Sequence, residues 1–486
     1  MKPSLERTTR NLRGSFVWAI GSLFLLAGAL TGAKQLSDNS FFTHLATGHI
    51  IWDTRSIPRA DPFTFTAFGE PWVVQSWLVS TIYAGLESTV GLVGIRFFHA
   101  FLAGLGGLGI WHLTKSAESL IPRLAIAALG FAVCAPGFVE RPLMVGFVAF
   151  VAILILVDNG PLWTAIPLMW IWINSHGSFP MGILILLAIT MGKWLDGDDI
   201  ARQKKLLSLV AIGIVIGGFI TPRPGVLLWF PFQLLARNQA FQAIQEWQSP
   251  DFSTSWMKIY LFQLVLVMVA LTYAWVQRWS KVLPVCLMVA AALLAVRNVP
   301  MAGLFFSIAL ADAAPSFGSF TASQKLRSTV PLLGAAALSL ISIAVWVIKS
   351  PDLNLKQYPM SIIIYLEKHE LLPNPEVRLA YPARLGNYLN YRYGATGTTF
   401  FDDRFDVYPL PILDSFTGLY RGSDVRRTLD QYQIDYVVAE RETPIAHALG
   451  GNTDWQQVID LTDSGRIATG PVSRASDAHF VLFERR

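Results

Sequence analysis

Long apolar runs separated by short polar segments fill the first 349 residues of the chain. A helix needs about 20 apolar residues to cross a bilayer at right angles, and several of these runs are shorter, so some helices must be tilted or broken. The pattern predicts a mainly α-helical multi-pass membrane protein with eleven spans. These are residues 16–33, 94–113, 123–139, 143–157, 162–173, 179–195, 206–220, 259–276, 282–296, 299–311 and 330–348.

Residues 72–86 are a further apolar stretch, and the parity of the spans decides its interpretation. Basic residues before the first run predict a cytoplasmic N-terminus. With eleven spans, four basic turns then also fall in the cytoplasm, whereas a twelfth span would move them outside. We therefore predict that residues 72–86 form an amphipathic helix in the interface, within a first extracytoplasmic loop of residues 34–93. The basic turns are 115–123, 202–205, 278–281 and 325–327.

The composition changes at residue 350 to that of a soluble domain. Short β-rich runs alternate with helix-like stretches, which predicts a small α/β domain. The chain therefore divides into a transmembrane domain of residues 1–349 and an extracytoplasmic α/β domain of residues 350–486. The predicted strands are 377–380, 398–401, 436–439 and 478–483, and the predicted helices are 362–371, 423–432 and 455–459.

Hydrophobic residues make up 53% of the 486 residues and charged residues 15%. Soluble domains have about 25% charged residues, so the composition excludes that class. The net charge of +5 is unevenly divided: residues 1–349 hold 24 basic and 15 acidic residues (+9), and residues 350–486 hold 14 and 18 (−4). The basic excess belongs to the membrane part, where it sets topology and can hold membrane lipids, and nothing indicates a nucleic-acid partner. Cys134 and Cys286 lie in apolar runs, which argues against a disulfide between loops.

The first loop is polar and aromatic, and it is longer than a connection between two helices requires. Asp38 follows the first span by a few residues. A carboxylate there could act as a general base toward an acceptor hydroxyl or hold a divalent cation, or it could be a solvated loop acid. His44 lies nearby, but His49 is not on quite the same helix face, so the pair is a weak metal signal.

Other polar residues fall at the outer ends of predicted spans, where charge is costly and indicates function. Arg141, beside Glu140, offers a planar fork that suits a phosphate, although an arginine can also anchor a helix end in the interface. Asn174 and His176 could contact a phosphate or a sugar, or only cap a helix end. Two more candidates are Arg223, in a proline-rich turn, and Arg297, between two apolar runs.

Arginines, histidines and an acid on the outer side would suit an anionic, lipid-linked ligand. The arginines would meet its phosphate or pyrophosphate, and a polyprenyl tail could lie between spans. A carboxylate would activate a hydroxyl while the cations stabilise the departing phosphate.

These residues resemble those of the GT-C superfamily of integral membrane glycosyltransferases, most closely a bacterial group with a small C-terminal soluble domain. In that group the first loop reads roughly D-x-D-x-W-W-H-L-x-x-G, then I-P-x-x-D-P-F-x-x-T. Residues 38–48 and 57–66 match these motifs here, and Arg96, Arg141 and residues 172–177 match later ones in order. The tail motifs GNYLNYRYG and FFDDRFDVYP also match.

The resemblance implies sugar transfer, with inversion, from a polyprenyl-phosphate donor to a glycan, lipid or protein acceptor of the envelope. It places the protein in the plasma (inner) membrane and implies Asp38 as the catalytic base. Ser40 stands where the second acid of the usual pair is expected, so a divalent cation such as Mg²⁺ or Mn²⁺ is not supported and no cofactor is predicted. Asp61 and Glu140 are possible second acids.

Two other functions stay open at this point. A transporter or flippase for a lipid-linked glycan would show two related halves, and no such duplication is visible. A non-catalytic GT-C relative that binds a lipid-linked glycan would be consistent with Ser40.

Overall fold

The computed structural model describes residues 2–237, 244–273, 278–314, 330–460 and 479–486. The chain divides into two compact units. The helical unit comprises Met1–Gln35, Val90–Pro231 and Ile244–Asp352. The mixed unit comprises Leu36–Thr89, Phe232–Ala243 and Leu353–Arg486.

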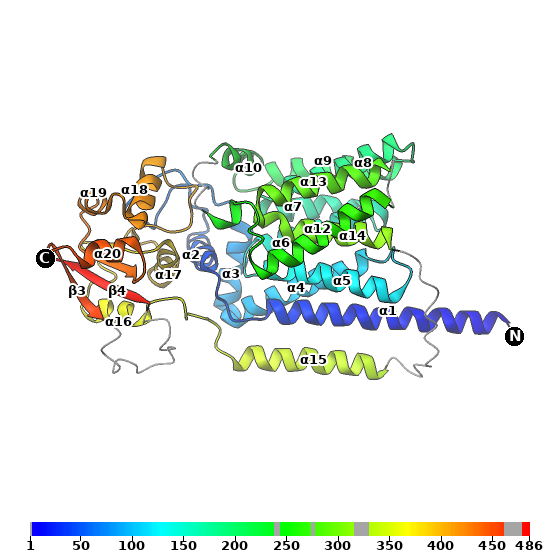
Figure 1. The fold of residues 1–486 in the computed structure, drawn as a ribbon, viewed down its shortest axis with the longest axis horizontal. Helices are drawn as coiled ribbons and strands as arrows, with labels where there is room; N and C mark the ends of the chain where they lie inside the picture. The colour runs from blue at the N-terminus through cyan, green and yellow to red at the C-terminus, as the bar shows by residue number, and fades with distance from the viewer. Residues whose placement is uncertain (1, 238–243, 274–277, 315–329, 461–478) are drawn as a thin grey trace. The chain divides into compact units, whose positions relative to one another are not determined.

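The eleven apolar runs predicted from the sequence all fall on helices of the helical unit (Figure 1). The final residues of the run at 259–276 lie outside the described residues. A further helix, α10 (Val226–Ala236), was not predicted. The helices that match the runs are α1 (Lys2–Gly32), α4 (Leu92–Leu113), α5 (Leu120–Cys134), α6 (Leu143–Asp158), α7 (Ala165–Ser175), α8 (Phe179–Leu195), α9 (Ala201–Phe219), α12 (Ser255–Tyr273), α13 (Trp279–Leu294), α14 (Val299–Ala313) and α15 (Val330–Lys349).

Three helical segments are long and apolar enough to span a membrane among the described residues: Leu92–Leu113, Leu120–Gly137 and Ser255–Thr272. Shorter apolar helical segments of 10–17 residues include Val17–Gly32, Leu143–Asp158 and Gly334–Lys349. The protein is therefore a membrane protein, and the number of eleven spans stays a prediction.

Small residues allow α1 and α4 to pack closely as an antiparallel pair. A Cβ atom on Gly28 would lie 2.1 Å from the carbonyl oxygen of Ala103, and one on Gly107 would lie 2.2 Å from that of Phe24. Larger residues at these glycines would force the backbones apart, as is typical of helix contacts in membranes.

Arg96, on α4, holds the C-terminal ends of α1 and α15 together. Its guanidinium is buried and donates hydrogen bonds to the carbonyl oxygen of Ala33 at 3.0 Å and to that of Val347 at 2.7 Å. It also forms an ion pair with Asp352 at 3.1 Å. The last carbonyls of a helix have no partner within the helix, and a cation next to them is favourable.

The mixed unit contains a four-stranded sheet in the order β1-β2-β4-β3. β1 is parallel to β2, and the other two pairs are antiparallel. Buried residues such as Val437, Val438 and Leu482 form the centre of the sheet. The strands are β1 (Leu379–Ala380), β2 (Tyr436–Glu440), β3 (Trp455–Asp460) and β4 (Phe480–Arg485). The helices of this unit are α2 (Asn39–Thr54), α3 (Trp77–Val90), α16 (Met360–Lys368), α17 (Ala383–Tyr393), α18 (Leu410–Arg421), α19 (Val425–Gln431) and α20 (Pro444–Gly450).

Three predictions for the mixed unit need correction. Residues 455–459, predicted as a helix, form β3. Residues 398–401, predicted as a strand, are outside the sheet, and Thr399 makes only an isolated bridge to Thr64. The helix predicted at residues 72–86 begins at Trp77.

The first loop and the C-terminal segment share one hydrophobic core. Phe42 of α2 contacts the rings of Tyr358 and Tyr388 at centroid distances of 5.6 and 5.3 Å. Residues 36–89, most of the predicted first loop, pack with residues 353–486 in this unit. Aromatic burial thus joins segments more than 300 residues apart into one unit.

Candidate active site

Asp38 is the N-cap of α2, immediately after the first apolar helix. Its backbone is extended (φ −70°, ψ 130°), and its side chain accepts a hydrogen bond from the backbone N–H of Ser40 at 3.0 Å. Aspartate is a preferred N-cap because its oxygen satisfies a free N–H of the first turn. The half-buried side chain is therefore oriented by a local bond that follows directly from the sequence Asp38-Asn39-Ser40.

A second carboxylate, that of Asp403, lies against the same first turn. It accepts hydrogen bonds from the hydroxyl of Ser40 at 2.5 Å and from the side-chain amide of Asn39 at 3.2 Å. The backbone N–H of Asp403 donates to the side-chain oxygen of Asn387 at 3.1 Å, and Thr43 of α2 donates to the same oxygen at 2.7 Å. The tail motif thus touches the first-loop motif through named polar contacts.

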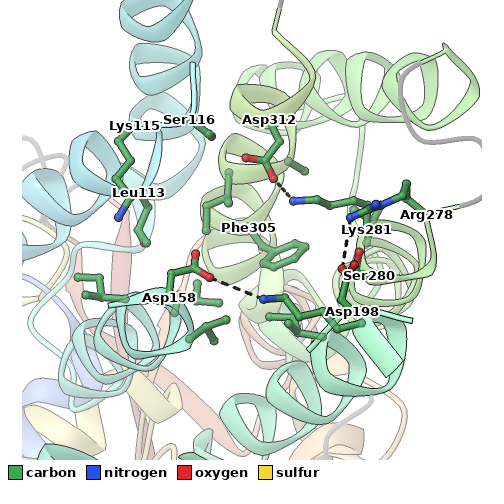
Figure 2. Close-up of a pocket in the computed structure, with 18 residues that line it drawn as sticks. Leu113, Lys115, Ser116, Asp158, Asp198, Arg278, Ser280, Lys281, Phe305 and Asp312 are labelled. Carbon is green, nitrogen blue, oxygen red and sulfur yellow. Dashed lines mark hydrogen bonds and ion pairs between the residues drawn. The ribbon is translucent and has the colours of Figure 1, made fainter. Parts of the chain in front are cut away.

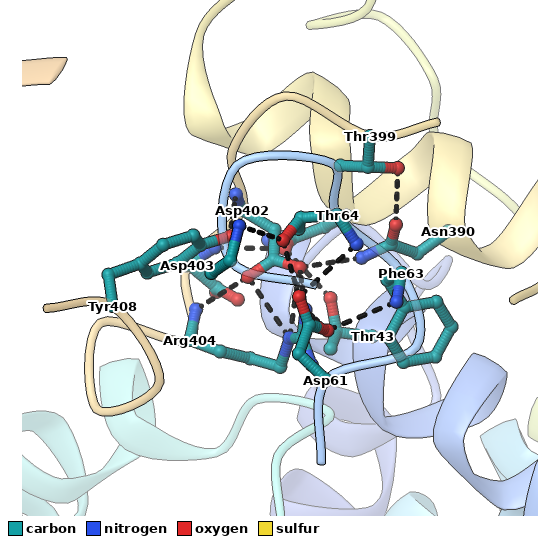
Figure 3. A network of polar contacts seen from close by, with 12 residues as sticks. Thr43, Asp61, Phe63, Thr64, Asn390, Thr399, Asp402, Asp403, Arg404 and Tyr408 are labelled. Carbon is teal, nitrogen blue, oxygen red and sulfur yellow. Dashed lines mark hydrogen bonds and ion pairs between the residues drawn. The ribbon is translucent and has the colours of Figure 1, made fainter. Parts of the chain in front are cut away.

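A buried ion network lies beside this contact (Figure 3). Arg404 forms ion pairs with Asp61 at 2.7 Å and with Asp402 at 2.6 Å. Its guanidinium also lies over the rings of Phe63 and Trp72, at 4.8 and 4.5 Å from their centroids. Burial alone would lower the pKa of Arg404, but the two carboxylates raise it above its usual value, so the side chain stays charged.

Asp61, which the sequence predicts to bind substrate, makes several contacts within the protein. One of its oxygens accepts from the backbone N–H of Phe63 at 3.1 Å, and the other accepts from the N–H and hydroxyl of Thr64. With Arg404 in addition, both oxygens of this buried side chain are used. A carboxylate satisfied in this way holds the loop conformation.

Asp406 carries an unfavourable charge near the same network. Burial raises its pKa to about 6, although Arg404 acts in the opposite direction. Arg237 donates hydrogen bonds to the backbone carbonyl oxygens of Asp406 at 2.5 Å and of Tyr408 at 2.6 Å. These bonds fix the backbone of the turn and do not involve the Asp406 carboxylate.

The two histidines of the first loop have separate surroundings. His44 is half-buried, and its Nδ1 lies 3.5 Å from the hydroxyl of Ser80. His49 forms an ion pair with Glu87, which also accepts a hydrogen bond from Tyr391 at 3.3 Å. Among the described residues, no group of three or more His, Cys, Asp or Glu side chains is placed to hold a metal ion.

Two of the predicted arginines come together in the helical unit. Arg141, just before α6, forms an ion pair with Glu246 at 2.5 Å. Arg297, just before α14, lies 4.0 Å from the same carboxylate and 4.4 Å from the ring centroid of Trp247. Burial alone would raise the pKa of Glu246, but the arginines outweigh it and hold the pKa below its usual value. Because the three side chains are 23–36% exposed, this cluster can be reached by a ligand.

The remaining candidates of the helical unit divide by their contacts. Asn174 is buried, donates to the carbonyl oxygens of Trp170 and Gly217, and accepts from Thr221, which favours its capping role. His176 accepts from the N–H of Ser178 at 3.1 Å through Nδ1. Glu140 and Arg223 are half-buried, in the segments before α6 and between α9 and α10 respectively.

The structure thus brings Arg141 and Arg297 together around Glu246, which the sequence did not indicate. It also brings the tail acid Asp403 to the turn that Asp38 begins. Asp38 belongs to the mixed unit, and Arg141 and Arg297 belong to the helical unit. The sequence showed that Asp403 lies in a tail motif of the family, but it did not show that this motif contacts the first loop.

A cavity of about 320 Å³ lies in the helical unit at the ends of α6 and α14 opposite to Arg141 and Arg297 (Figure 2). Its apolar wall includes Phe305. Most of its charges are paired with one another: Lys193 with Asp158 at 4.0 Å, Arg278 with Asp198 at 3.3 Å, and Lys281 with Asp312. These internal pairs, and its place at the other helix ends, put it outside the candidate site.

The comparison with solved structures identifies the fold. The oligosaccharyltransferase AglB from Archaeoglobus fulgidus, in complex with an inhibitory peptide and a dolichol-phosphate, aligns over 87% of this chain and 69% of its own, with a TM-score of 0.52 and 11% identity. The apo form of the Archaeoglobus fulgidus enzyme aligns over 87% of this chain and 70% of its own with the same score and identity. The chain shares the fold of this enzyme, which belongs to the GT-C superfamily.

A third structure, the Archaeoglobus fulgidus enzyme in complex with Zn and sulfate, aligns over 86% of this chain and 68% of its own. Its TM-score is 0.50 and its identity 12%. No protein-family model matches the chain, and no curated protein matches it by sequence. At this level of identity the GT-C likeness describes the fold, and the chemistry must be argued from the residues.

Proposed function

We propose that this protein is a glycosyltransferase of the plasma membrane. It moves a sugar from a polyprenyl-phosphate donor to an envelope glycan, lipid or protein acceptor on the outer face, with Asp38 as the general base. The observation that carries the proposal is the GT-C fold over 87% of the chain, together with an oriented carboxylate at the residue that the first-loop motif implies. The similar enzyme in complex with a dolichol-phosphate supports a lipid-linked donor.

The proposed reaction divides the work between two sets of side chains. The Asp38 carboxylate accepts the proton of the acceptor hydroxyl, whose oxygen attacks the anomeric carbon of the sugar from the face opposite the phosphate. The bond between that carbon and the phosphate oxygen breaks, and the electron pair leaves with the polyprenyl phosphate. One displacement of this kind inverts the anomeric centre.

Arg141 and Arg297 would stabilise the charge on the departing phosphate. In the structure they share the carboxylate of Glu246. An anionic donor would compete with this carboxylate for the two guanidinium groups. No role is proposed for a metal ion, since Ser40 stands in place of the second motif acid.

The test uses the purified full-length protein and a panel of radiolabelled polyprenyl-phosphate sugars. We expect turnover of at least one donor, and we expect Asp38→Asn to abolish it while the protein stays folded. Asp53→Asn is the matched control, because Asp53 is exposed near the other end of the same helix. Retained turnover in Asp38→Asn would rule out the proposed base.

Ser40 also keeps a second function under consideration, that of a non-catalytic GT-C protein which binds a lipid-linked glycan. That function predicts saturable binding of a donor without turnover. Transport instead of transfer would appear as movement of the labelled lipid across a vesicle membrane without loss of its sugar.

A further inference from the structure

The first-loop motif of this chain lacks its second acid, and a carboxylate from the C-terminal segment lies at that place. Ser40 occupies the position of the missing acid. Its hydroxyl donates to Asp403 at 2.5 Å, while its backbone N–H donates to Asp38 at 3.0 Å. One residue therefore connects the two carboxylates, although they are far apart in sequence.

The surroundings hold Asp403 in a defined position. Its own N–H donates to Asn387, which also binds Thr43 of α2. Its neighbours on both sides, Asp402 and Arg404, are buried and paired with each other at 2.6 Å. Side chains locked by packing and by further hydrogen bonds are what keep a reacting group in place.

The orientation of Asp403 differs from that of its neighbours. The side chain of Asp402 accepts from Arg404 and from Asn390, inside the network. The side chain of Asp403 accepts from Ser40 and Asn39 in the first turn of α2 and is half-buried. A buried turn that only shaped the tail would not need this second acid to face the loop.

We propose that Asp403 is a positioning residue for Asp38, acting through Ser40 and Asn39. By holding the first turn of α2 it fixes the direction of the N-cap carboxylate and so takes over the place of the second motif acid. This inference rests on the proposed function. Small displacements of a reacting group have large effects, because a shift of about 1 Å can cost about 100-fold in rate.

The test exchanges the two partners. In Asp403→Ser the contact with Ser40 loses its carboxylate, and we expect kcat to fall about 100-fold with the donor KM nearly unchanged. In Ser40→Asp two carboxylates face each other, and we expect a similar loss. In the double variant Ser40→Asp/Asp403→Ser the carboxylate and the hydroxyl change places, the pair can form again, and we expect kcat to recover to within about 10-fold of the wild type.

Asp414→Ser is the control, since Asp414 is an exposed acid on α18. If both single variants keep the wild-type kcat, or if the double variant is no better than the singles, the proposal is overturned. Loss of turnover in Asp38→Asn together with unaffected Asp403 variants would remove this inference and leave the proposed function in place. Turnover in Asp38→Asn would instead overturn the proposed base.

Hydrogen exchange gives a readout that does not depend on turnover. In the wild type the N–H of Ser40 is bonded to Asp38. We expect faster exchange of residues 39–42 in Asp403→Ser and restored protection in the double variant. Unchanged exchange in Asp403→Ser would overturn the proposal even if no donor is turned over.

Discussion

Two charged clusters of this protein have opposite ratios of arginines to carboxylates. In the mixed unit, one arginine, Arg404, is shared by the carboxylates of Asp61 and Asp402, and all three are buried. In the helical unit, one carboxylate, Glu246, is shared by Arg141 and Arg297, and all three are partly exposed. Both clusters contain the same two kinds of groups, but they differ in net charge and in access to solvent.

This difference separates a scaffold from a ligand site. An arginine that is buried between two carboxylates and two aromatic rings is closed to a ligand, so its contacts act on the fold. Two accessible arginines that share one acid can exchange that contact for one with an incoming phosphate. Four substitutions test this difference between the two clusters.

The largest effect is expected for Arg404→Met. It removes the one cation between two buried carboxylates, and breaking a buried pair in this way costs about 3–5 kcal/mol of unfolding free energy. Thermal and denaturant unfolding in detergent would measure the loss. Arg426→Met is the control, because the Arg426 side chain is 82% exposed and its removal should cost less than about 0.5 kcal/mol. Equal stability of the two variants would mean that the network does not support the fold.

Arg141→Met should affect ligand binding more than stability. Loss of a charged hydrogen bond to phosphate corresponds to about 1.5–3 kcal/mol, or about 10- to 100-fold weaker binding of a polyprenyl-phosphate sugar. Equilibrium binding of the labelled donor would show this. Arg278→Met is the matched control, since Arg278 lies at the opposite helix ends and should leave binding unchanged. Comparable losses in both variants would remove Arg141 from the site.

Asp406→Asn removes a carboxylate whose burial destabilises the folded state. The folded-state pKa of Asp406 is raised to about 6, from 3.8, so the ionised form disfavours folding. The variant should be more stable than the wild type by about 1–3 kcal/mol at pH 8. The advantage should shrink as the pH falls from 6 toward 4, where the wild-type side chain takes up its proton. A gain that does not change with pH would exclude this explanation.

Glu246→Gln should have the smallest effect. It removes the negative charge that both arginines share, and we expect donor affinity to rise about 2- to 10-fold. The lowered pKa of Glu246 means that it stabilises the fold above about pH 4.5 and that this contribution is lost as the pH falls through its folded-state pKa. The stability of the Glu246→Gln variant should therefore not show this decrease at low pH. Weaker donor binding would show that Glu246 assists the ligand instead of competing with it.

The hydrophobic pattern predicted the helices of the helical unit well, because an apolar run in a membrane protein has few other ways to satisfy its backbone. It failed at residues 455–459, where a register irregularity between Gln457 and Ile459 breaks the alternation of β3. It also missed α17, whose buried residues include Asn387 and Asn390. Because some buried positions of this helix are polar, its hydrophobic residues do not repeat with the helical period.

The candidate site was predictable only in part. Asp38 and Arg141 were indicated by their place beside apolar runs. Glu246 was missed because an acid in a long loop gives no sign of a partner 105 residues away. Asp403 and Ser40 are 363 residues apart, and only folding brings them together. Pairs of this kind are fixed by tertiary packing, which a local pattern does not contain.

Arg96 has a consequence for how the protein is made. Its bond to the carbonyl oxygen of Val347 joins residues 251 positions apart, so at about 5–20 residues per second the partner appears about 10–50 s after the arginine. During synthesis the guanidinium can use only the carbonyls of Ala33 and Lys34. We therefore expect chains ending at residue 340 to be more sensitive to protease near α4 than chains ending at residue 360. Docking of α15 then marks the point at which all helices of the helical unit have been synthesised.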